Sequence, residues 1–170
     1  MTALRAYFVP VDDVHGVLLA VLEAAQRSIH VSMYGFTDEE LLVTLLGRYA
    51  AGVSLQVTLD QSQSRGPVEA ALLAAHPLPA GTTAIGHSEK DQIIHHKVCV
   101  VDGLTVVTGS TNWSHSGEYE EDNDLLVIET PTLAATYTAR LTALHHWVLA
   151  HPSVGTVDLM PDAEETSNQE

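Results

Sequence analysis

Residues 93–114 constrain the fold more than any other part of the chain, because they predict a β-hairpin. Residues rich in Val, Ile and Thr stand on both sides of Asp102-Gly103, a common turn dipeptide between antiparallel strands. Alternate side chains of a strand share one face. His95 and Lys97 are therefore predicted to point in the same direction, and His96 in the opposite one.

The second strand of this hairpin ends at Gly109, where a glycine permits a tight turn. Ser110 and Asn112 follow and are predicted to lie beside the start of the first strand, near His95 and Lys97. An imidazole, an ammonium, an amide and a hydroxyl then converge without a carboxylate among them. Such a set favours an anion with several oxygens, and phosphate is the predicted ligand.

Strands and helices are predicted to alternate along the rest of the chain, and several strands are apolar on both faces. This pattern is typical of an α/β layered domain in which helices flank a central sheet. Thr37 and Glu40 have the spacing of a capping box at the start of one helix. The predicted strands are 7–9, 28–34, 53–59, 82–85 and 123–128; the predicted helices are 12–26, 38–49, 67–75 and 130–149, with a polar loop at 60–66.

Length and composition predict a single domain, residues 1–157, followed by an acidic C-terminal tail, residues 158–170. The first residues do not have the pattern of a signal peptide, and no apolar run is long enough to span a bilayer. We therefore expect a soluble protein, either cytoplasmic or the mature form of a secreted one. The formal charge of −15, with only seven Lys and Arg residues, argues against binding duplex DNA by charge alone.

The spacing of the hairpin residues resembles the signature of the phospholipase D superfamily. The residues that carry this resemblance are His95, Lys97, Asp102, Gly109, Ser110 and Asn112. Segments 32–37 and 122–128 also resemble the single-motif branch of that superfamily, which contains bacterial endonucleases and their mitochondrial and piRNA-pathway relatives. The resemblance implies a phospholipase D-like layered domain with a central mixed β-sheet flanked by helices.

A phosphodiester is hydrolysed more easily in two steps, and His95 is the predicted nucleophile, which forms a covalent phosphohistidine. Lys97 and Asn112, with Ser110 as a weaker candidate, are predicted to bind the non-bridging phosphate oxygens. A general acid is also needed on the far side of phosphorus. The only other lysine, Lys90, has no histidine two residues before it, so the chain contains no second motif. We therefore predict a homodimer with the active site on its twofold axis, as the resemblance also implies.

The resemblance further implies supporting residues. Asp102 belongs to the signature, but alternation places it on the face opposite His95, so we expect it to support the hairpin or the interface. Family members carry a Glu or Gln after the motif that orients the catalytic histidine. Asp122 corresponds to that residue here, with Glu121 as the alternative in register.

The predicted function is that of a metal-independent endonuclease that hydrolyses nucleic acid and needs no cofactor. The alternative is a phospholipase D-type phosphodiesterase that acts on a lipid or a small molecule. The sequence has no basic amphipathic segment to hold a membrane surface, so no stable membrane association is expected. A third hypothesis is a catalytically idle module for dimerisation or nucleic-acid binding.

Four neighbouring residues, His95, His96, Cys99 and Asp102, could be interpreted as a metal site. Alternation divides them between two faces of the strand, so no metal site is predicted.

Two aromatic or histidine positions have structural interpretations. Trp113 is predicted to be an interface or pocket aromatic, with a base-stacking platform as the alternative. His145-His146 stand near the end of the last predicted helix, where positive charge is favourable.

Overall fold

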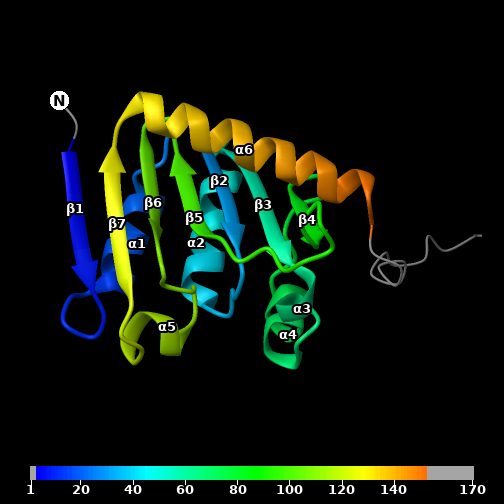
Figure 1. Ribbon diagram of the computed structural model, residues 1–170, viewed down its shortest axis with the longest axis horizontal. Coiled ribbons are helices and arrows are strands. Elements are labelled where there is room, and N and C mark those ends of the chain that lie inside the picture. The colour runs from blue at the N-terminus through cyan, green and yellow to red at the C-terminus, as the bar shows by residue number, and fades with distance from the viewer. Residues whose placement is uncertain (1–2, 153–170) are drawn as a thin grey trace, which may run out of the picture.

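The computed structural model describes residues 3–152, which form one mixed β-sheet flanked by helices (Figure 1). Its seven strands have the spatial order β1-β7-β6-β5-β2-β3-β4. Strands β2, β3 and β4 are parallel, and all other neighbouring pairs are antiparallel. The strands are β1 (Ala3–Phe8), β2 (Ser28–Met33), β3 (Ser54–Asp60), β4 (Thr83–Gly86), β5 (Lys97–Val101), β6 (Thr105–Gly109) and β7 (Asp124–Glu129). The predicted α/β fold is confirmed; the tail predicted at 158–170 lies outside the described residues.

Two long helices pack on one face of the sheet and a third packs on the other (Figure 1). On the first face, Leu18 and Leu22 of α1 and Leu42 and Leu45 of α2 are fully buried against the strands. Burial of each such side chain stabilises the fold by roughly 1.5–3 kcal/mol, so this layer forms the main core. The helices are α1 (Val14–Glu23), α2 (Glu39–Ala50), α3 (Gln61–Ser64), α4 (Pro67–Ala75), α5 (His115–Tyr119) and α6 (Pro131–Ala150).

Helix α6 crosses the other face of the sheet and buries Leu141, Leu144 and Val148. His145 lies in the same buried stripe, where its Nδ1 is 3.0 Å from Thr58 Oγ1. Burial lowers the pKa of His145 and favours its neutral form, so the predicted helix-end charge is wrong for this residue. Within residues 3–152 no helix, α6 included, is both long and apolar enough to cross a membrane.

The predicted hairpin is confirmed as β5 and β6, which pair from Val98 opposite Thr108 to Val101 opposite Thr105. Asp102 in its turn has a φ of 57° and Gly103 has a φ of 64°. The first strand begins at Lys97, four residues after the predicted start of the hairpin at residue 93. The N–H of Ile94, before that strand, donates to the Asp60 carboxylate instead of to a neighbouring strand.

Helix α2 begins one residue later than the capping-box pattern predicts. Asp38 is its N-cap and accepts a hydrogen bond from Leu41 N at 2.7 Å, so the predicted pairing of Thr37 with Glu40 is wrong. The polar loop predicted at 60–66 contains the four-residue helix α3, and α5 was not predicted either. Both helices are too short to show a helical period in the sequence.

Candidate active site

The residues of the predicted site meet at one edge of the sheet. Lys97 begins β5 and Gly109 ends β6, and these strands are antiparallel neighbours. The start of one strand and the end of the other therefore share an edge, the lower one in Figure 1, where α3, α4 and α5 also lie. His96 points to the α6 face, where its Nδ1 lies 3.1 Å from Ser32 Oγ, as alternation predicts.

His95 and Lys97 both contact Tyr34, the residue that follows β2. The Lys97 Nζ lies 4.6 Å from the centroid of the Tyr34 ring, and the His95 ring meets the Tyr34 ring edge-on with centroids 4.7 Å apart. The Lys97 ammonium also donates to the backbone carbonyl of His95 at 3.3 Å. Burial lowers the pKa of Lys97, while the negative charges of Asp60 and Glu121 oppose that effect. His95 itself is exposed and can be reached from outside the chain.

Asn112 reaches the same edge from the segment after β6. Its Oδ1 accepts a hydrogen bond from Gly35 N at 3.3 Å. Because the amide oxygen is engaged, Asn112 presents its Nδ2 as a hydrogen-bond donor.

Ser110 is also at this edge, but its hydroxyl is engaged elsewhere. It donates to Asn123 Oδ1 at 2.8 Å and accepts from Asp124 N at 3.0 Å. The chain can pass this close to β7 because residue 109 is glycine: a Cβ on Gly109 would lie 2.2 Å from Asp124 O. In this arrangement the Ser110 hydroxyl joins β6 to β7, and its predicted contact with phosphate requires that it leave these partners.

Asp102 lies at the opposite end of β5 from Lys97. Its carboxylate accepts hydrogen bonds from the backbone N–H groups of Gln26, Arg27 and Ser28, at distances of 2.7–3.2 Å. Asp102 therefore ties the hairpin turn to the segment that leads into β2, away from His95.

The two candidates for the residue that orients His95 differ in their surroundings. Asp122 is exposed and makes no hydrogen bond with residues 3–152. The Glu121 carboxylate accepts a hydrogen bond from Asn123 Nδ2 at 2.8 Å, and its charge opposes the lowering of the Lys97 pKa by burial. Of the two registers, Glu121 is thus the one that acts electrostatically on the site.

The sequence analysis missed Asp60, Gln63 and the contacts of Tyr34 with the motif side chains. Asp60 ends β3 and is buried; its Oδ2 accepts from Ile94 N at 2.6 Å, next to His95 in the chain. Gln63 of α3 donates through Nε2 to the Tyr34 hydroxyl at 3.0 Å. The only sequence signal for Asp60 is an acidic residue directly after a buried strand.

Trp113 is a core residue, so the predicted role as an interface or pocket aromatic is wrong, and so is the alternative of a base-stacking platform. It is 2% exposed and packs edge-on against Phe36, with ring centroids 5.0 Å apart. The chain enters the interior there because Trp113 N donates to Gly35 O and its carbonyl accepts from Thr37 N.

A second polar cluster, His15 with Asp38 and Glu118, lies among α1, α2 and α5 and brings three possible ligand atoms within 4.8 Å of one another. His15 Nδ1 is 2.5 Å from Glu118 Oε2. Two ligands of one tetrahedral zinc ion lie about 3.3 Å apart, so this contact is a hydrogen bond. Burial raises the pKa of Glu118 to about 7, which is consistent with a shared proton.

The other metal interpretation, which joined His95, His96, Cys99 and Asp102, does not match the structure. His95 and Asp102 lie at opposite ends of β5, and Cys99 is buried in the core. Burial raises the pKa of the Cys99 thiol to about 12, so the thiolate that a metal requires is disfavoured.

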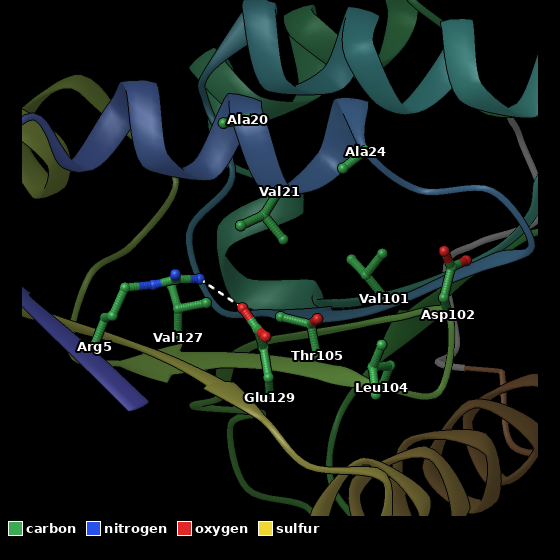
Figure 2. Close-up of a pocket in the computed structure, with 10 residues that line it drawn as sticks. All are labelled: Arg5, Ala20, Val21, Ala24, Val101, Asp102, Leu104, Thr105, Val127 and Glu129. Atoms are coloured by element: carbon green, nitrogen blue, oxygen red, sulfur yellow. Dashed lines mark hydrogen bonds and ion pairs between the residues drawn. The ribbon is translucent and has the colours of Figure 1, made fainter. Parts of the chain in front are cut away.

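A cavity lies on the α1 face of the sheet near the hairpin turn, far along β5 from Lys97 (Figure 2). Helix α1 lines it with Ala20 and Val21, and its C-cap Ala24 lines it too. An ion pair between Arg5 and Glu129, 2.7 Å long, closes one side. None of the predicted catalytic side chains lines this cavity. The candidate active site lies at the other edge of the sheet, where His95 is exposed and Lys97 and Asn112 are partly buried.

The sequence matches the family model described as "Cardiolipin synthase, PLD-like domain" over residues 18–145. The mitochondrial cardiolipin hydrolase of Xenopus laevis is 27% identical over 153 residues, which are 90% of this chain and 69% of that protein. A phospholipase D of Rickettsia bellii is 28% identical over 116 residues, which are 68% of this chain and 56% of that protein. The chain thus spans little more than half of the Rickettsia protein.

Two solved structures have the same fold. The phospholipase D family member Nuc from Salmonella typhimurium superposes with a TM-score of 0.75 at 23% identity, covering 85% of this chain and 94% of that one. NucT from Helicobacter pylori superposes with a TM-score of 0.73 at 16% identity, covering 85% and 96%. The family match, together with an exposed histidine, a lysine and an asparagine at one edge of the sheet, identifies the chain as a phosphodiesterase of the phospholipase D superfamily.

Proposed function

We propose that the protein is a metal-independent endonuclease that cuts nucleic-acid phosphodiester bonds through a covalent phosphohistidine at His95. The observation that carries this proposal is the arrangement around Tyr34 and Gly35: the exposed His95 ring and the Lys97 ammonium both contact the Tyr34 ring, and Asn112 binds the N–H of Gly35. The resemblance to single-motif endonucleases and the match to nearly the full length of Nuc support the nuclease activity.

In the first step a neutral His95 nitrogen attacks phosphorus, and the P–O bond to the leaving group breaks. Lys97 and the Nδ2 of Asn112 stabilise the charge on the non-bridging oxygens. The leaving oxygen takes a proton from a second imidazole on the far side. In the second step water attacks the phosphorus of the phosphohistidine, the P–N bond breaks and His95 is released. The second imidazole, now neutral, accepts the proton of the water.

The second imidazole is His95 of another copy of the chain. Only one histidine in the sequence stands two residues before a lysine, and one ring cannot occupy both sides of phosphorus. His95 is exposed at the sheet edge, so a twofold axis through that edge can bring two copies together. The homodimer is therefore a requirement of this chemistry.

A lipid-directed phosphodiesterase is the second candidate, because two relatives are named cardiolipin hydrolase and phospholipase D.

The charge distribution opposes the binding of a long polyanion: Glu120, Glu121 and Asp122 are exposed beside the site, and the net charge is −15. We therefore expect the nucleic-acid substrate to be single-stranded or short, since fewer phosphates then face these carboxylates.

One panel of substrates tests these functions. Plasmid, a single-stranded oligonucleotide, phosphatidylcholine and cardiolipin vesicles, and a chromogenic phosphodiester are each incubated with the protein in excess EDTA. We expect cleavage of the oligonucleotide and the chromogenic diester, and a loss of at least about 10²-fold in His95→Ala.

The matched control is His146→Ala, which removes an exposed histidine on α6. It should retain wild-type rates. Cleavage of lipids alone would replace the nuclease by the lipid hypothesis, and a strict need for a divalent cation would exclude the phosphohistidine mechanism.

A further inference from the structure

We propose that Tyr34 is a positioning residue that holds His95 and Lys97 in their reactive arrangement, and that Gln63 of α3 fixes Tyr34. This inference rests on the proposed function. It assigns a task to the residue after β2 and to α3 that the motif residues alone do not supply.

The Tyr34 ring is shared by both motif side chains. Its face lies 4.6 Å from the Lys97 Nζ, and its centroid lies 4.7 Å from that of the His95 ring. The face of an aromatic ring attracts a cation, and an edge-on arrangement is favourable between two rings. One side chain therefore restricts the long, flexible stem of Lys97 and the exposed ring of His95 together.

The backbone of Tyr34 is tied to the same segment. Tyr34 N donates to the carbonyl of His96 at 2.8 Å, and Met33 pairs with Lys97 across β2 and β5. The backbones of residues 34 and 96 therefore cannot move apart without breaking the ladder. The ring is delivered to His95 by the same strand pairing that begins β5.

The Tyr34 hydroxyl is fixed from the other side of the site by α3. Gln63 Nε2 donates to it at 3.0 Å, and α3 is in turn capped by Asp60, which accepts from Ser62 N at 2.9 Å. Asp60 also holds Ile94 N at 2.6 Å. Asp60 at the end of β3 therefore acts on the site in two ways. It fixes the Tyr34 ring through α3 and Gln63, and it fixes the backbone before His95 through Ile94.

In this arrangement the tyrosine ring has the main task and its hydroxyl serves as an anchor. The ring contacts are retained when the hydroxyl is removed, but the anchor to Gln63 is lost. Tyr34→Leu removes both. A misplacement of catalytic groups by about 1 Å can cost about 10²-fold in rate, which sets the expected size of the effect.

The test is steady-state kinetics on the chromogenic diester, with thermal unfolding measured for every variant. Tyr34→Leu should lower kcat by about 10²-fold with KM changed by less than about threefold, because positioning acts on the transition state. Tyr34→Phe and Gln63→Ala should each lower kcat by less than about tenfold. Their double variant should be no worse than either single one, since both remove the same hydrogen bond. Tyr49→Leu, at an exposed tyrosine of α2, is the control.

A wild-type kcat in Tyr34→Leu would overturn the proposal, as would additive losses in the double variant. If Tyr34→Leu does not fold, the cycle of Tyr34→Phe and Gln63→Ala still decides the role of the anchor. A readout independent of activity separates this inference from the proposed function. In NMR spectra the Lys97 ε-methylene protons should be shifted upfield by the Tyr34 ring, and Tyr34→Leu but not Tyr34→Phe should abolish that shift. Absence of the shift in the wild type would disprove the contact even if the enzyme is active.

Discussion

The carboxylate of Asp60 joins two segments on either side of the candidate nucleophile. Its Oδ1 accepts from Ser62 N at 2.9 Å and from Ser62 Oγ at 2.5 Å, and its Oδ2 accepts from Ile94 N at 2.6 Å. The side chain is 1% exposed, so water cannot replace these bonds. Both the start of α3 and the approach to His95 therefore depend on one buried anion.

We predict that Asp60→Asn destabilises the protein by about 1–3 kcal/mol. The Asn side chain has the same shape, but its NH₂ group replaces one of the two oxygens that accept hydrogen bonds. That NH₂ group would face the N–H of either Ile94 or Ser62, and two donors cannot bond to each other. The measurement is the urea midpoint at pH 7. Asp122→Asn, at an exposed carboxylate without a hydrogen bond among the described residues, is the control and should change stability by less than about 0.5 kcal/mol. Equal midpoints for the two variants would contradict the prediction.

At this scale the sequence predicted residues that share a motif and missed residues that reach the site from other strands. His95, Lys97 and Asn112 have fixed spacings around one hairpin, so their convergence follows from local pairing. Tyr34 and Gln63 arrive through the order of β5, β2 and β3 in the sheet. That order is a property of the whole fold, and no local pattern encodes it.

At the scale of elements, the β5–β6 hairpin is held at its two ends by different means. At the turn, burial acts to raise the pKa of Asp102, but hydrogen bonds from Ser28, Gln26 and Arg27 N–H groups and the charge of Arg27 outweigh it. The pKa of Asp102 is thus lower than its ordinary value. A carboxylate whose pKa is lowered on folding stabilises the fold at every pH above its pKa in the unfolded chain, about 3.9. This contribution is lost as the pH falls through its pKa in the folded protein.

We predict that Asp102→Asn lowers stability at pH 7 by about 1–2 kcal/mol, because a neutral amide accepts three N–H groups less well than a carboxylate. The difference from wild type should shrink as the pH falls below about 3.9. Guanidinium unfolding at pH 7 and at low pH measures both quantities. Asp91→Asn is the control, since Asp91 also has a positive φ, 56°, and its side chain is 88% exposed and pairs with His87 at 3.2 Å instead of with three backbone N–H groups. A pH-independent difference would show that charge is not the cause.

Elements with a long period or a clear turn were predictable from the sequence, and short ones were not. Helix α4 has the predicted bounds 67–75, and the other long helices and the strands lie within a few residues of theirs. Helix α5 has only five residues, which is too short to show a hydrophobic period in the sequence. Trp113 reaches the core because its backbone bonds to Gly35 and Thr37 after β2, and periodicity does not encode such bonds. His145 was misassigned because its partner Thr58 lies 87 residues away in β3.

At the scale of the whole molecule, basic side chains are largely occupied away from the site. Arg5 pairs with Glu129 and Arg140 with Glu89, and Arg27 donates to the carbonyl of Asp102. Lys97 is a cation at the motif edge, beside an acidic segment at 120–122. A second copy of the chain across that edge would bring a second lysine and a second imidazole to one phosphate, which is what the proposed chemistry needs.

We predict that a mixed dimer of wild-type and His95→Ala chains loses at least about 10²-fold in activity, because one histidine attacks while the other donates the proton. Two affinity tags, one on each chain, allow the mixed dimer to be purified. A mixed dimer of wild type with His146→Ala should be fully active. Independent sites would leave the His95→Ala mixed dimer with about half of the wild-type rate, and sedimentation of an active monomer would likewise exclude a shared site. The design separates a shared catalytic centre from mere association, since both mixed dimers have the same subunit contacts and differ only in which histidine is removed.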